Sequence, residues 1–349
     1  MKLLVCALGV GVMLCAGCGD PPESPAPGTP GPPGTPGSKG GSSEESGGGK
    51  VKVVATIWPL ASVAREMGGD AVEVACLLPG GVSPHFAPDS AKMMAAVRGA
   101  DLIIANGSGL DHWVLSAARA AGRDEAEIFW VSKHVEGECD HETDADAHEG
   151  HGHRGHGHDD HGHGHDDHGH GHGGVDPHYW LDPVLMGEVC GHLEAEMGAL
   201  IGERGGDVAA LRARAAELRE KIEALDGEFR ERFGGLEGAK VVTFHDAFGR
   251  MAERYGVEVA ATLRPMGGLG DVTPDRIAEV IGVIERYELK AVFGEPQFSP
   301  EAARLVEQKT GARVLVLDPL GHPMEADRSG YVDLMRYNLE TMLKGITGP

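Results

Sequence analysis

Short apolar segments alternate with helical segments in two separate blocks of this chain, and this alternation restricts the possible folds more than any other feature. The apolar segments cover residues 51–57, 72–78, 101–106 and 127–131 in the first block, and residues 240–244, 257–263, 291–294 and 314–317 in the second. They are short and apolar on both faces, which is typical of parallel strands covered by helices. We therefore predict an α/β fold with two Rossmann-like domains, each built on a parallel sheet. The N-terminal domain would comprise residues 51–133 and 176–205, and the C-terminal domain residues 235–349.

A long helix is predicted between the two blocks, over residues 206–234. Leucine and isoleucine recur along one stripe of this segment, charged residues fill the rest, and strong helix formers dominate throughout. The apolar stripe consists of Leu211, Leu218, Ile222 and Leu225. At 1.5 Å per residue such a helix is about 40 Å long. The heptad pattern is too short for a coiled coil, so we expect a rigid helix that joins the two domains.

The first 18 residues are typical of an export signal. Lys2 precedes an apolar run that ends at Leu14, which is too short to span a membrane. The following Cys15-Ala16-Gly17-Cys18 resembles a bacterial lipobox, although Cys15 stands where leucine is usual. We predict cleavage before Cys18 and its lipidation; the alternative is an ordinary signal peptide. Residues 19–50, rich in Pro, Gly and Ser, would form a flexible tether. The protein would then be exported and anchored to a membrane, facing the periplasm or the cell exterior.

Charge and cysteine content exclude several classes of function. The net charge of −23 argues against nucleic-acid binding, which requires a basic face, and suits a protein that concentrates cations. The cysteines that follow Cys18 are Cys76, Cys139 and Cys190, which form neither a disulfide framework nor a closely spaced zinc motif. We expect Cys76 to be a small buried residue within its apolar strand.

Most of the 19 histidines lie between His134 and His172, interleaved with glycine and aspartate. This composition cannot form a packed core, so residues 134–175 are predicted to be a disordered loop. Imidazole is a common ligand of zinc, nickel and copper, and we expect many weak sites that capture metal. A pH-responsive linker and accidental low complexity are the alternatives. The predicted capture residues are His151, His153, His156, His158, His161, His163, His165, His168, His170 and His172.

A second set of metal ligands is predicted at strand ends and in turn-rich loops. His85 follows the strand of residues 72–78, His178 lies in an Asp-Pro-His sequence after the histidine-rich segment, His245 ends a strand, and Asp318 follows the strand of residues 314–317. Ligands of open α/β sheets bind beyond the C-terminal ends of the strands. Three histidines and one carboxylate suit a closed tetrahedral zinc site in the cleft between the domains. We assign the other histidines outside the loop to surface or packing positions; these are His112, His192 and His322.

The chain resembles the solute-binding proteins of bacterial zinc and manganese ABC transporters, the ZnuA and TroA-like group. The motifs that carry the resemblance extend over residues 51–345 and include residues 53–60, 101–107, 176–183, 244–248, 294–299 and 317–321. The resemblance implies two α/β domains joined by a rigid helix, one metal ion in the cleft, and a membrane permease as partner. It also implies His85, His178, His245 and Asp318 as the ligands. A histidine-rich loop before the Asp-Pro-His sequence is common in zinc members.

Details of the motifs favour zinc over manganese. Manganese members typically have glutamate at the position of His245, and imidazole favours zinc over a harder cation. Glu295 is a candidate to orient a ligand histidine. The sequence departs from the family where His85 is followed by Phe86-Ala87-Pro88 and preceded by Pro84, which places the carboxylate role on Asp318.

Two other functions remain open at this point. The first is an extracellular metal-buffering lipoprotein or adhesin without a transport role. The second is a zinc hydrolase that uses Asp246 as a base, although four protein ligands would leave no open position for water and no hydrolase motif is present. We expect a monomeric, non-enzymatic zinc carrier.

Overall fold

The computed structural model describes residues 49–78, 80–86, 91–135, 176–264 and 272–348. These described residues all fall within one compact unit. The predicted signal peptide with Cys18, the tether up to residue 48, and the metal-capturing histidines between His151 and His172 lie outside the described residues. Among the helices of the described ranges, none is both long enough and apolar enough to cross a membrane.

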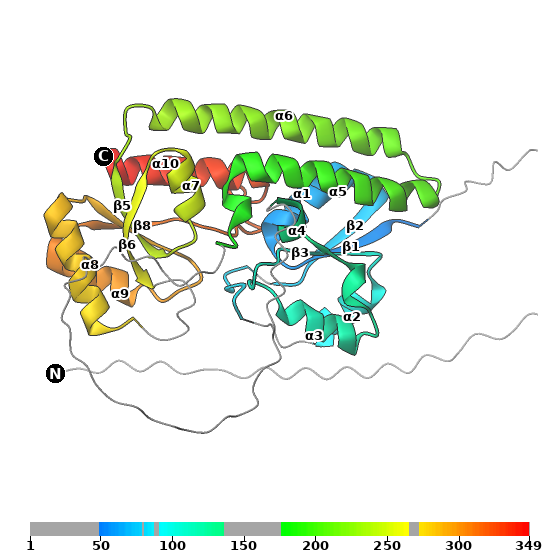
Figure 1. Ribbon diagram of the computed structural model, residues 1–349, viewed down its shortest axis with the longest axis horizontal. Helices are drawn as coiled ribbons and strands as arrows, with labels where there is room; N and C mark the ends of the chain where they lie inside the picture. Colours follow the sequence, from blue (N-terminus) through cyan, green and yellow to red (C-terminus); the bar gives the residue numbers. More distant parts are fainter. Residues whose placement is uncertain (1–48, 79, 87–90, 136–175, 265–271, 349) are drawn as a thin grey trace, which may run out of the picture. The chain divides into compact units, whose positions relative to one another are not determined.

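The first half of this unit is a four-stranded parallel sheet with helices on its faces (Figure 1). The strands lie in the order β2-β1-β3-β4, so that Val53 of β1 pairs with Val74 of β2 on one side and with Leu102 of β3 on the other. The elements are β1 (Val51–Ala55), α1 (Trp58–Gly68), η1 (Gly69–Ala71), β2 (Val72–Cys76), α2 (Ala91–Gly99), β3 (Leu102–Ala105), α3 (Trp113–Ala120), η2 (Glu125–Glu127), β4 (Ile128–Trp130) and α4 (Ser132–Val135).

The second half repeats the same arrangement, with a parallel sheet in the order β6-β5-β7-β8. The two parallel-sheet domains predicted from the alternating pattern are thus confirmed. The elements are β5 (Lys240–His245), α7 (Gly249–Arg254), β6 (Glu258–Arg264), α8 (Pro274–Tyr287), β7 (Ala291–Gly294), α9 (Glu301–Thr310), β8 (Arg313–Val316) and α10 (Tyr331–Thr347). In each sheet the chain order reverses next to the first strand, which makes the C-terminal ends of β1 and β3, and of β5 and β7, the expected positions for a ligand.

Two long helices lie between the sheets in chain order, although only the second was predicted as a long helix. After η3 (Tyr179–Leu181), α5 (Pro183–Glu203) starts with Asp182 as N-cap and Pro183 at its first position. It is followed by α6 (Val208–Phe233), which packs along α5 and also contacts α1 and α10 (Figure 1). The predicted stripe is buried together with Ala215, Phe229 and Phe233. The helix therefore rests on both halves of the molecule along its apolar face.

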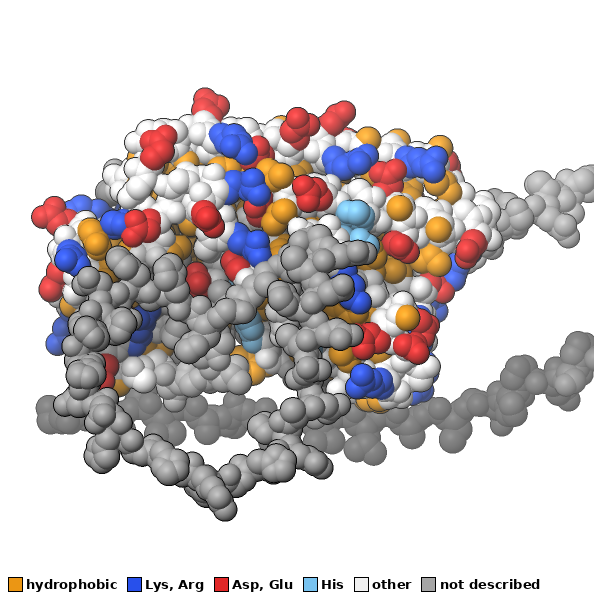
Figure 2. Space-filling model, viewed as in Figure 1, with side chains coloured by type: hydrophobic (Ala, Val, Ile, Leu, Met, Phe, Trp, Pro, Cys, Tyr) orange, Lys and Arg blue, Asp and Glu red, His pale blue; other side chains and the backbone are white. Residues whose placement is uncertain are grey.

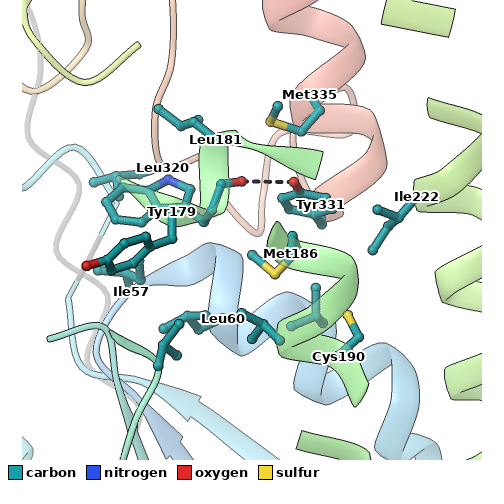
Figure 3. Close-up of a cluster of buried hydrophobic side chains, with 14 of the residues drawn as sticks. Ile57, Leu60, Tyr179, Leu181, Met186, Cys190, Ile222, Leu320, Tyr331 and Met335 are labelled. Atoms are coloured by element: carbon teal, nitrogen blue, oxygen red, sulfur yellow. Dashed lines mark hydrogen bonds between the residues drawn. The ribbon is translucent and has the colours of Figure 1, made fainter. Parts of the chain in front are cut away.

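The largest hydrophobic cluster includes residues from both halves. It contains Leu60 of α1, Met186 of α5, Phe248 beside α7 and Leu339 of α10, while two smaller clusters lie on the other faces of the sheets. Figure 3 shows part of this cluster, in which the hydroxyl of Tyr331 donates a hydrogen bond of 2.8 Å to the carbonyl of Trp180. Burial of apolar surface common to both halves holds the two domains together.

Two cysteines fall within the described residues, and both are free thiols. Cys190 is buried in α5, whereas Cys76 at the end of β2 is half-buried and donates a weak hydrogen bond to the Leu78 carbonyl at 3.3 Å. The expectation that Cys76 is a small buried residue therefore holds only in part, because its strand lies at the edge of the sheet. Desolvation raises the pKa of each thiol to about 12, so neither is a reactive thiolate near neutral pH.

Candidate metal centre

Three of the four predicted ligands lie together. The ligand nitrogens of His85, His178 and His245 are all within 4.8 Å of one another. His85 and His178 come from the first half of the fold and His245 from the second, so the group bridges the two domains. His178 and His245 are buried, and His85 is half-buried. The cluster lies where the fold predicts a ligand, since His245 ends β5 at the reversal point of the second sheet.

The spacing of the three imidazole rings fits a single metal ion. Two imidazoles that bind one tetrahedral zinc through nitrogen have ring centroids roughly 5 Å apart, given Zn–N bonds of ~2.0–2.1 Å. Here the centroid separations are 5.3 Å between His178 and His245, 5.8 Å between His85 and His178, and 6.0 Å between His85 and His245. Small side-chain movements would bring all three rings to bonding distance.

His178 is oriented by a carboxylate on its own loop. Asp176 Oδ1 lies 2.7 Å from His178 Nδ1 and also accepts the backbone N–H of His178 at 3.0 Å. Burial opposes ionisation of Asp176, but these hydrogen bonds outweigh it and lower the pKa of the carboxyl. An ionised Asp176 accepts a hydrogen bond from Nδ1–H, which keeps the proton on Nδ1 and leaves the lone pair on Nε2. His178 Nε2 is buried and has no hydrogen-bond partner among the described residues, as expected for a metal-ligating atom.

The loop that carries His178 is held by the end of β3. Asn106 Nδ2 donates to the Pro177 carbonyl at 2.7 Å, and the buried Asp111 accepts the Asn106 backbone N–H at 2.7 Å. Asp111 also accepts the hydroxyl of Thr56 at the end of β1. The ends of β1 and β3, where the chain order of the first sheet reverses, therefore support the site through backbone and side-chain hydrogen bonds. Among the described residues, they supply none of the three clustered histidines. From the second half, Arg250 Nε donates to the Asp176 carbonyl at 2.8 Å.

His245 has a similar carboxylate partner. Glu295, directly after β7, places Oε1 2.6 Å from His245 Nδ1 and 3.2 Å from its backbone nitrogen. The hydrogen bond required by the predicted orienting role of Glu295 is thus present, and it leaves Nε2 of His245 toward the other two imidazoles. Such carboxylate–histidine pairs fix the tautomer and raise the basicity of a ligating imidazole. Phe298 packs edge-on against the His245 ring, with centroids 5.3 Å apart.

Asp318, the fourth predicted ligand, is buried after β8 but is not part of the histidine group. Its Oδ1 accepts the backbone N–H groups of Leu320 and Gly321 at 3.0 and 2.9 Å, and its Oδ2 lies 3.6 Å from an Arg328 nitrogen. In this structure Asp318 closes a turn and pairs with Arg328. Its coordination of a metal stays a prediction.

His85 lies on a loop after β2 whose position depends on an indole. Trp113 Nε1 donates to the Pro84 carbonyl at 3.0 Å. Burial, together with the charges of His178, His245 and Arg264, lowers the pKa of His85 to about 4. His85 is therefore neutral at physiological pH, which is the form that binds metal.

The same pKa predicts how the stability of the metal-free protein depends on pH. Between about pH 6.5 and 4, the unfolded chain protonates His85 and the folded protein does not, so acidification favours unfolding. The free energy of unfolding should fall over this range by up to about 3 kcal/mol from this group alone. Urea unfolding of wild type and His85→Gln at several pH values measures it. The variant should lose less stability on acidification; equal losses would contradict the pKa assignment.

The remaining sequence assignments concern histidines outside the cleft. His112 is exposed with its ring beside Trp130, and His322 accepts the Met324 backbone N–H. Both fit the surface or packing role. His192 is exposed on α5, but its ring lies 4.6 Å from that of His134. The sequence did not predict this pair. It also did not predict Asp176 as the hydrogen-bond partner of His178, although an aspartate two residues before a histidine is a recognisable signal for such a contact.

Comparisons with known proteins identify the family and the fold. A family model described as zinc-uptake complex component A, periplasmic (ZnuA), matches residues 53–345. The high-affinity zinc uptake system protein ZnuA of Bacillus subtilis is 28% identical over 310 residues, covering 86% of this chain and 89% of that protein. The zinc-binding lipoprotein AdcA of Streptococcus pneumoniae is 25% identical over 316 residues, covering 86% of this chain but 57% of AdcA. This chain thus spans just over half the length of AdcA.

A solved structure shows the same fold. The periplasmic zinc-binding protein TroA of Treponema pallidum superimposes with a TM-score of 0.68, at 19% identity, covering 85% of this chain and 99% of TroA. At this level of identity the likeness concerns the fold.

Proposed function

The chain belongs to the ZnuA family of zinc-uptake components, and on this premise we propose that it binds Zn²⁺ between its two α/β domains and delivers it to a membrane permease of the ABC type. The observation that carries the proposal is the group of three histidine nitrogens within 4.8 Å of one another, drawn from both halves of the fold. The names of relatives that bind or take up zinc support the choice of metal.

The proposed ligands are His85, His178, His245 and Asp318. The carboxylate partners of His178 and His245 hold Nδ1 and leave Nε2 for the metal, which supports these two roles. Asp318 would have to turn its carboxylate from Arg328 toward the cleft, and its position directly beyond β8 is what supports it as the fourth ligand. Three imidazoles favour zinc over manganese, whose preferred ligands are oxygen atoms.

The rest of the proposal concerns residues outside the described ranges. Cys18 would carry the lipid anchor, and the protein would face the periplasm or the cell exterior. The histidines between His151 and His172 would collect zinc and raise its concentration near the cleft. The description of AdcA as a lipoprotein and of the family as periplasmic supports export. We propose that the protein acts as a monomer.

We propose that the protein is a carrier and not an enzyme. Three histidines with one open position also occur in catalytic zinc sites, so the fourth ligand distinguishes the two functions. Asp246, which a hydrolase would use as its base, has its pKa raised by burial and by repulsion from Asp176. In a carrier, Asp318 would complete the four-coordinate shell of the zinc ion. In a hydrolase, a water molecule would occupy that fourth position.

Zinc uptake by cells tests the proposal. A strain without the gene, grown under zinc limitation, should recover radioactive-zinc uptake with the wild-type gene. Because Asp318→Ala removes one of four proposed ligands, this variant should bind zinc about 10-fold or more weakly and restore less uptake. Asp327→Ala, which removes an exposed carboxylate close in sequence, is the matched control and should restore it fully.

Other outcomes would separate the alternatives. Normal uptake without the gene, with zinc still bound tightly by the purified protein, would favour a buffering or adhesin function. Unchanged zinc affinity and uptake in Asp318→Ala would remove Asp318 from the ligand set.

A further inference from the structure

An arginine occupies the carboxylate that the proposed metal site requires. The two oxygens of Asp318 have different partners: Oδ1 accepts the backbone N–H groups of Leu320 and Gly321, whereas Oδ2 faces Nη1 of Arg328 at 3.6 Å. The turn thus fixes Asp318 through one oxygen and leaves the other oxygen to a positive charge. Since Oδ1 is engaged in the turn, Oδ2 is the atom for which a metal ion and Arg328 would compete.

This ion pair differs from the exposed pairs of the surface. Figure 2 shows acidic and basic side chains interspersed over the visible face of the molecule, where water screens such pairs. The side chain of Asp318, in contrast, is 5% exposed and that of Arg328 is 17% exposed. A buried carboxylate without a counter-charge is strongly unfavourable. In the metal-free protein, Arg328 therefore supplies the positive charge that zinc would supply in the loaded protein.

Arg328 has a second carboxylate partner on its own loop. Glu325 forms a close ion pair with Nη2 of Arg328, and the guanidinium lies over the ring of Tyr337, with Cζ 4.5 Å from the ring centroid. Asp327 Oδ1 is 3.5 Å from Nε, but its side chain is more exposed and contributes little. Nε is buried and makes no hydrogen bond within the described part of the chain. The arginine can thus give up Asp318 and keep a charged partner.

The backbone around Arg328 is held in place, so this exchange requires only a side-chain movement. The Arg328 carbonyl accepts the His322 backbone N–H at 3.2 Å, and the Arg328 N–H donates to the Glu325 carbonyl at 2.9 Å. The next carbonyl, that of Ser329, accepts the indole N–H of Trp58 at 3.1 Å. Trp58 is the first residue of α1, so the loop is also anchored on the first half of the fold.

We propose that Arg328 is a built-in competitor of zinc that sets the affinity and the release rate of the cleft site. In the metal-free protein it neutralises Asp318, and when zinc binds Oδ2 the guanidinium moves away and remains paired with Glu325. Because zinc has to displace a cation, the metal-free state is favoured and release is assisted. This suits a carrier that gives up its metal, and it rests on the proposed role of Asp318 as the fourth ligand.

The affinity of the tightest zinc site in the full-length protein tests this role, measured by competition against a chromophoric zinc chelator. Arg328→Gln should bind zinc about 10-fold more tightly than wild type, which is the effect of one charge-assisted interaction, and should release it more slowly to excess chelator. Arg328→Lys, which keeps the positive charge, should stay close to wild type. Arg336→Gln is the matched control, because it removes the same charge from an exposed pair with Glu228 and should change neither quantity.

A double-mutant cycle separates competition for Asp318 from other effects of the arginine. In the Asp318→Ala background, Arg328→Gln should change zinc affinity little, because the contested oxygen is gone. Stability gives a readout without metal. Metal-free Arg328→Gln should unfold at a lower urea concentration than wild type, since Asp318 loses its counter-charge, and saturating zinc should remove this difference.

The outcomes distinguish this inference from the proposed function. If Asp318→Ala weakens zinc binding but Arg328→Gln does not strengthen it, Arg328 is not a competitor and the proposed function stands. A gain in affinity that is equally large in the Asp318→Ala background would also overturn the inference, because the charge would then act without Asp318. If neither His245→Ala nor Asp318→Ala weakens the tight site, the proposed site and the inference fail together.

Discussion

Replacing His245 with alanine is expected to remove the tight zinc site. His245 is 9% exposed and ends a central strand, and Glu295 fixes its ring, so its Nε2 is held in place for the metal. Loss of a residue that orients a metal ligand typically costs 10–100-fold in affinity, and loss of the ligand itself should cost more than about 100-fold. Competition titration against a chromophoric zinc chelator, with wild type and His245→Ala side by side, measures the change.

The control for this variant is His322→Ala, which removes a histidine of the same domain that is not part of the cleft group and whose ring accepts the Met324 backbone N–H. Its zinc affinity should equal that of wild type. The histidine-rich segment will still bind several ions weakly in both variants, so the comparison depends on the tightest site. Equal tight affinity in wild type and His245→Ala would show that the cleft is not the primary site.

Replacing Trp180 with alanine is expected to cause the largest loss of stability. Its side chain is 1% exposed, its indole N–H donates to the Pro319 carbonyl at 2.6 Å, and its own carbonyl accepts the Tyr331 hydroxyl. Both partners belong to the second half of the fold, whereas Trp180 belongs to the first. A buried Trp→Ala change costs about 3–5 kcal/mol, and urea unfolding of the metal-free protein should show a loss of this size.

Zinc binding should weaken as well, because the Trp180 ring packs against His178 with centroids 5.2 Å apart. Trp180→Phe is the control, since it keeps most of the apolar volume and loses the hydrogen bond to Pro319, at a cost of about 1–2 kcal/mol. An Ala variant as stable as wild type would mean that this contact does not hold the domains together.

The architecture could be predicted because it depends on local pattern. Short apolar strands alternating with helices imply parallel sheets, and the stripe from Leu211 to Leu225 implies one buried face of a helix. The long helix α5 was not predicted, even though Asp182 and Pro183 are strong start signals, because four glycines within it lower its helix propensity. That α6 packs against both halves depends on tertiary contacts, which no local pattern reveals.

In the candidate site, too, features that depend on local pattern could be predicted, and features that depend on tertiary contacts could not. His85 and His245 could be proposed because each lies at or beyond the C-terminal end of a strand in its own parallel sheet, where ligands of open α/β sheets bind. The hydrogen bonds from Asp176 to His178 and from Asn106 to Pro177 could not be predicted, since they depend on how a loop folds back over β3. The contact between His134 and His192 could not be predicted either. The two residues lie 58 positions apart in the sequence and meet only because α4 packs on α5.

The most direct test of the central claim is anomalous diffraction at the zinc edge from crystals grown with one equivalent of Zn²⁺. We predict one dominant peak between the domains, at ~2.0–2.1 Å from Nε2 of His85, His178 and His245. A dominant peak elsewhere, or one bound by histidines of a single domain, would contradict the proposal that zinc is held between the two halves of this protein.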